Sequence, residues 1–143
     1  MSDVDQDNSR ILEPILANIG EEAAEIIGSD LDGLYLYGEV EDGSQFASLF
    51  KDEGEVARYH GPSQRLFQLL DEAWRAENSD EGKRWTVIEY EVTGTRFDVR
   101  FTYPEQLDPN EHCSERCSAA VRKRFGNKPV IYPSIPGEFR EMR

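Results

Sequence analysis

The fold is decided by residues 34–50, which read LYLYGEVEDGSQFASLF. Two alternating apolar runs flank Glu41-Asp42-Gly43, and this pattern predicts a β-hairpin. A three-residue loop would place Gly43 in the left-handed conformation that such loops favour. In this register one face of the hairpin is predicted to carry Leu34, Leu36, Val40, Phe46 and Phe50, and the opposite face Tyr35, Tyr37, Ala47 and Leu49.

A helix is predicted before this hairpin. Apolar residues recur at helical spacing over residues 11–27, and Asn8 or Ser9 can cap the start of the helix. Residues 1–8 are acidic and are expected to form a flexible tail. Residues 9–143 are then expected to form a single folded domain, because no stretch resembles a linker between domains.

More strands and helices are predicted after the hairpin. Residues 55–59 predict a third strand, and Pro62 is expected at the first position of a second helix. Asp108-Pro109 combines a cap with a first-turn proline, so a third helix is expected from Pro109 to about Phe125.

A second hairpin is predicted between the last two helices. Its strands cover residues 84–92 and 95–103, joined by a two-residue loop at Thr93-Gly94. This register places Glu91 opposite Arg96 on the polar face. The predicted order is α-β-β-β-α-β-β-α, and short connections between successive strands indicate an antiparallel meander. We therefore expect an α+β domain in which three helices pack on the sheet.

The charge of the chain is unevenly distributed. The 143 residues have a net charge of −13, and residues 1–59 contain 15 acidic and 3 basic side chains. The first 59 residues thus account for −12 of the net charge. A field of one sign steers partners of the opposite sign, which favours a basic protein partner. The same charge argues against nucleic-acid binding through a broad basic surface.

Several classes of protein are not expected from this sequence. No apolar stretch is long enough for a membrane span, and the acidic start has no secretory h-region. The two cysteines, Cys113 and Cys117, are too few for a disulfide framework and are expected to be reduced in a helix face. We therefore expect a cytoplasmic protein. No phosphate-binding glycine loop or nucleophile elbow is present, and we expect no cofactor.

One group of carboxylates leaves an enzymatic alternative open. Glu89, Glu91 and Asp98 are predicted on one face of the second hairpin, where they could hold a divalent cation for a metal-assisted hydrolase. Arg96 and Arg100 are predicted on the same face and would compensate the carboxylate charge. We favour a protein that is not an enzyme and holds no metal.

A candidate binding surface surrounds the first strand. Tyrosine is frequent at binding hot spots, and carboxylates nearby can steer a basic partner. If the second face of the sheet is open, both tyrosines of the first strand would be available to a partner. If a helix covers that face, they would be buried. The predicted partner-binding residues are Asp30, Asp32, Tyr35, Tyr37, Glu39, Glu41 and Asp42.

Three segments resemble the YezG-like antitoxin (immunity protein) family. They are LYLYGEV at 34–40, WTVIEY at 85–90 together with GTRFDVRFTY at 94–103, and RFGNKP at 124–129. The resemblance covers most of residues 10–132. It implies a small cytosolic protein that binds and neutralises a cognate bacterial toxin, often a nuclease.

Besides the hydrolase, an acidic adaptor that forms a homodimer through an exposed edge strand remains an alternative.

Overall fold

One open sheet of six strands organises the protein. The computed structural model describes residues 3–77 and 84–132, with side chains from residue 11 onward. The strand order is β5-β4-β1-β2-β3-β6, and every pair is antiparallel except β3–β6. The strands are β1 (Leu34–Glu41), β2 (Ser44–Asp52), β3 (Ala57–His60), β4 (Val87–Thr93), β5 (Arg96–Thr102) and β6 (Val130–Ile131).

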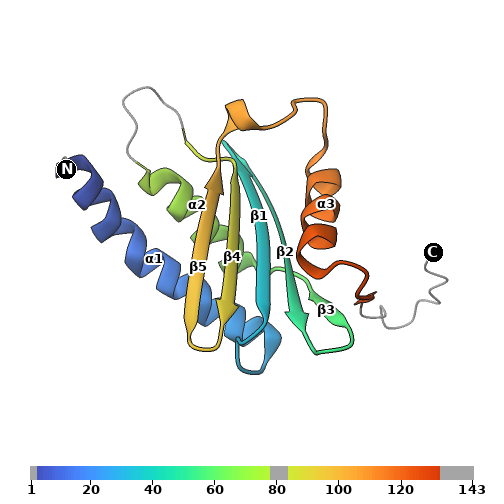
Figure 1. Ribbon diagram of the computed structural model, residues 1–143. Coiled ribbons are helices and arrows are strands. Elements are labelled where there is room, and N and C mark those ends of the chain that lie inside the picture. Colours follow the sequence, from blue (N-terminus) through green and yellow to red (C-terminus); the bar gives the residue numbers. More distant parts are fainter. Residues whose placement is uncertain (1–2, 78–83, 133–143) are drawn as a thin grey trace.

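Helices cover the sheet from both sides. They are α1 (Asp3–Ile27), α2 (Gln64–Ala76) and α3 (Cys113–Phe125), with a short 3-10 turn, η1 (Pro104–Gln106), before α3. Figure 1 shows α1 and α2 side by side behind the sheet, whereas α3 packs near β1 and β2 on the other face. The predicted α+β class and element order are confirmed, and β6 adds a short parallel edge strand.

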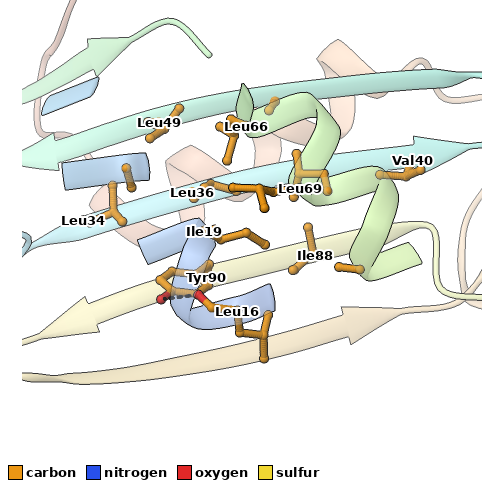
Figure 2. Close-up of a cluster of buried hydrophobic side chains, with 14 of the residues drawn as sticks. Leu16, Ile19, Leu34, Leu36, Val40, Leu49, Leu66, Leu69, Ile88 and Tyr90 are labelled. Carbon is orange, nitrogen blue, oxygen red and sulfur yellow. Dashed lines mark hydrogen bonds between the residues drawn. The ribbon is translucent and has the colours of Figure 1, made fainter. Parts of the chain in front are cut away.

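The main core lies between the sheet and the helices α1 and α2. Ile19 of α1 and Leu69 of α2 point toward Leu36 and Ile88 of the central strands, as Figure 2 shows. The Tyr90 hydroxyl donates to the backbone oxygen of Leu16 at 3.2 Å, which ties β4 to α1. A smaller core beneath α3 contains the opposite faces of β1 and β2.

The predicted register of the first hairpin is wrong by one residue. Glu41 pairs with Ser44 across the two-residue turn Asp42-Gly43, and Gly43 has φ 84°. Phe46 and Phe50 therefore lie on the tyrosine face, and Ala47 and Leu49 on the leucine face. Both faces are buried, so apolar side chains suit either one and their pattern could not select the register.

The register of the second hairpin also differs from the prediction. Thr93 pairs with Arg96 across Gly94-Thr95, so the shift is two residues and each side chain keeps its predicted face. Gly94 has φ 63° and stands first in the turn, the position that a type II′ turn reserves for glycine. Glu91 consequently faces Asp98 rather than Arg96.

The helix starts were predicted less well than the helix ends. α1 begins at Asp3, so the backbone of residues 3–8 belongs to the helix rather than to a separate tail. α2 begins after the N-cap Ser63, and α3 after the N-cap His112.

No helix among the described residues has the length and hydropathy of a membrane span.

Candidate functional site

Tyr35 and Tyr37, which were predicted at a binding surface, lie inside the protein. Their exposed fractions are 1% and 3%. The Tyr35 ring meets Phe125 of α3 edge-on with centroids 6.1 Å apart, and the Tyr37 ring meets Phe46 at 6.4 Å. The prediction of accessible tyrosines is therefore wrong, because α3 covers this part of the second sheet face.

Both tyrosine hydroxyls are anchored to carboxylates. Tyr35 donates to Glu89 at 2.6 Å, and Tyr37 donates to Glu39 at 2.6 Å. Burial raises the pKa of both phenols well above the ordinary value, and the hydrogen bonds to the carboxylates raise the pKa further. These groups thus remain neutral donors that fix the carboxylates in place.

Glu39 is also unavailable as a surface charge. Its carboxylate is 5% exposed and accepts hydrogen bonds from Arg116 Nε at 2.7 Å and from Arg116 Nη2 at 2.8 Å. The other terminal nitrogen of Arg116 donates to the backbone oxygen of Glu111 at 2.7 Å. This arrangement fixes the start of α3 against β1, so Glu39 serves the fold and cannot steer a partner.

The remaining predicted carboxylates do not form one patch. Asp30 and Asp32 precede β1, whereas Glu41 is its last residue and Asp42 follows it, and a strand of 8 residues is about 24 Å long. Asp32 accepts a hydrogen bond from the Gly94 backbone at 2.7 Å, which connects it to the β4–β5 turn. The prediction of a continuous anionic face is therefore wrong, although all four carboxylates are exposed.

Two hollows beside α3 share Phe46 in their lining; we call them together the α3 groove, and Glu41 lines one of them. The acidic end of the α3 groove has a volume of about 260 Å³ and is lined by Glu39, Glu41, Ser44, Phe46, Glu111, His112, Cys113 and Arg116. Its aromatic part has a volume of about 480 Å³ and is lined by Phe46, Ser48, Phe50, Tyr59, Ser114, Cys117, Ser118, Val121, Arg122 and Tyr132.

The two parts of the α3 groove offer different chemistry. Phe46 lines both parts and connects them. Glu41 and Glu111 are exposed at the acidic end, and neither side chain forms a hydrogen bond or ion pair with another described residue. Arg122, in the last turn of α3, marks the opposite end. The α3 groove can therefore bind a basic side chain of a partner at its acidic end and a neighbouring apolar or aromatic side chain of that partner in its aromatic part.

The carboxylates of the second hairpin are held by arginines. Glu89 accepts from Arg100 at 3.0 Å, and Glu91 accepts from Arg124 at 2.8 Å and lies 3.2 Å from Arg100. Within residues 3–77 and 84–132, no group of three or more metal-ligating side chains comes together. The geometry gives the metal-assisted alternative no support.

Sequence reasoning assigned no role to the α3 side of the groove. Arg116, Glu111 and His112 come from α3 or from the loop before it. Cys117, Val121 and Phe125 recur four residues apart and are buried, so their spacing could have indicated which helix face meets the sheet. Comparison with protein-family models and with curated proteins finds no match to this chain.

Proposed function

We propose that this protein is an immunity protein (antitoxin) that acts in the cytoplasm and binds a basic toxin domain, best matched by a nuclease, through the α3 groove. The observation that carries the proposal is that Glu41 and Glu111, which have no ion-pair partner among the described residues, line a hollow that shares Phe46 with the adjacent aromatic hollow. The resemblance to the YezG-like antitoxin family supports the same function.

Inhibition of this kind requires no chemistry from the inhibitor. A nuclease surface must be basic to hold phosphates, so an acidic protein can compete for it electrostatically. Carboxylates at the rim accelerate association, and buried aromatic contacts slow dissociation. In this protein Glu41 and Glu111 supply the first effect, and Phe46 and Tyr59 supply the second.

Rescue of growth tests the proposed function. The toxin encoded beside the gene is expressed with and without this protein, and protection of the cells is the expected result. If the genes beside this one encode no toxin, or if growth stops equally with and without this protein, the proposal fails.

Association kinetics test the proposed site. We expect the double variant Glu41→Lys/Glu111→Lys to bind the purified toxin at least roughly tenfold more slowly at low salt. Glu21→Lys/Glu25→Lys is the matched control, because it changes the same charge on exposed positions of α1. Equal slowing by both pairs would mean that net charge alone matters and that the α3 groove is not the site.

A further inference from the structure

β5 is an edge strand of the sheet. β5 stands at one end of the sheet, and within the described part of the chain no strand pairs with its outer side. The strand reads Arg96-Phe97-Asp98-Val99-Arg100-Phe101-Thr102 and contains no proline. Proteins usually protect such edges with prolines, bulges, a covering segment or charged side chains. Among the described residues β5 has only the charged side chains, so its regular backbone can pair with a strand of complementary charge.

The outward backbone groups of β5 follow from the hairpin register. Thr93 and Arg96 close a two-residue turn, and the closing pair of such a hairpin is hydrogen-bonded. Successive residues alternate, so the backbone groups of Phe97, Val99 and Phe101 face away from β4. The Thr102 carbonyl faces inward accordingly, since it accepts from the Thr86 N–H at 2.8 Å.

We infer that two copies of this protein pair through antiparallel β5 strands, with Val99 at the two-fold axis. In this register Asp98 of each copy lies opposite Arg100 of the other, and Phe97 lies opposite Phe101. The seven-residue strand is thus complementary to itself in charge and in apolar character. Opposite charges directly across a strand pair stabilise it, and the symmetry makes each contact twice.

Charge also selects this register over its neighbours. A shift of two residues in one direction would place Asp98 opposite Asp98 and Arg96 opposite Arg100. The same shift in the other direction would place Arg100 opposite Arg100. Like charges directly opposite destabilise a strand pair, whereas a shift of one residue would turn the apolar side chains to the polar face.

The side chains are available for these contacts. Asp98 is exposed and forms no ion pair with another described residue. The Arg100 side chain is 61% exposed and meets Glu89 and Glu91 through Nη2, so its Nε and Nη1 groups are left for Asp98 of the second copy. Phe97 is 47% exposed and stacks on Tyr90 with centroids 5.1 Å apart, which offers an ordered apolar surface to the second copy.

Sedimentation equilibrium of the full chain over a concentration series tests the dimer. We expect a monomer–dimer equilibrium for the natural protein. Asp98→Lys should weaken dimerisation roughly tenfold or more, because it creates two like-charge pairs with Arg100. Glu105→Lys makes the same change of charge at an exposed position outside β5 and is the matched control, with no expected effect.

Mixing two variants tests the register. Arg100→Glu alone should also weaken dimerisation, since it places two acidic pairs across the axis. An equimolar mixture of Asp98→Lys and Arg100→Glu proteins should recover a heterodimer, because both cross-strand pairs are again of opposite charge. Circular dichroism establishes that each variant is folded. A monomeric natural protein, a dimer insensitive to Asp98→Lys, or a mixture of folded variants that stays monomeric would each overturn the inference.

Discussion

Arg116 of α3 binds both carboxylate oxygens of Glu39 on β1, at 2.7 and 2.8 Å, across 77 positions of the sequence. Tyr37 donates a third hydrogen bond to the same carboxylate at 2.6 Å. A buried carboxylate is stable only when its charge and lone pairs are satisfied in this way. The pair therefore determines where the start of α3 meets the sheet, and hence the shape of the acidic end of the α3 groove.

Loss of Arg116 should destabilise the protein strongly. Arg116→Ala leaves Glu39 buried without its countercharge, and we expect the free energy of unfolding to fall by about 3–5 kcal/mol. Urea denaturation measures this change. Arg122→Ala, on an exposed position of the same helix, should change stability by no more than about 0.5 kcal/mol. A similar small loss for both variants would contradict a structural role for the pair.

Tyr35 and Tyr37 should resist ionisation in the folded protein. Burial raises the pKa of both phenols, so the folded state holds their protons more tightly than the unfolded chain does. Their contribution to stability is complete below about pH 10, the pKa of an unfolded tyrosine, and declines as the pH rises further.

An alkaline titration checks this behaviour of the tyrosines. Tyrosinate absorbance from Tyr35 and Tyr37 should appear together with the loss of circular dichroism. The single variants Tyr35→Phe and Tyr37→Phe should each reduce the amplitude of that step. Ionisation of both residues in a chain that is still folded would show that their hydroxyls are accessible.

The two cysteines should react at different rates. Burial raises the pKa of both thiols, that of the buried Cys117 to about 11, and Cys113 is only half-buried. At neutral pH Cys117 then has about a hundredfold less thiolate than an ordinary cysteine. Labelling by a thiol-reactive disulfide should be biphasic: Cys113→Ser removes the fast phase, and Cys117→Ser removes the slow phase. A single rapid phase would place both thiols at the surface.

Gly33 should be the less replaceable of two glycines with left-handed backbone. Gly33 has φ 91° and Gly54 has φ 96°, so alanine is strained at both positions by about 1–2 kcal/mol. A Cβ at Gly33 would also lie 3.1 Å from the Asp52 Cβ and 3.2 Å from the Asp52 backbone oxygen, whereas a Cβ at Gly54 would have no atom of the described residues within 4 Å.

Comparison of two alanine variants isolates that contact. Gly33→Ala should lower the free energy of unfolding by about 1–3 kcal/mol more than Gly54→Ala does. Both variants strain the left-handed backbone, but only the Cβ of Gly33→Ala is crowded by Asp52. Urea denaturation of the two proteins gives the difference directly. Equal losses of unfolding free energy would show that the backbone around Asp52 shifts to accommodate the added Cβ without a measurable loss of stability.

Local sequence patterns determined the elements of this protein and their order. Helical periodicity and turn glycines act within a few positions, so they indicated three helices and two hairpins without knowledge of the fold, whereas the predicted caps did not mark the helix starts. α3 ends at Phe125 as expected, and the φ of 64° at the following Gly126 shows why a glycine stands there. Alternation also assigned the side chains of β4 and β5 to the correct faces.

The tertiary structure alone decided which residues are buried and which can meet a partner. Tyr35 and Tyr37 have the same sequence context whether α3 covers them or leaves them open. Contacts between distant positions, such as the Glu39–Arg116 pair and the Tyr35–Phe125 ring contact, settle the question. Likewise, Asp32 and Asp42 are close in the chain, but an extended strand holds them at opposite ends of the sheet. Burial and charge clustering depend on contacts between distant segments, which the spacing of residues in one stretch cannot express.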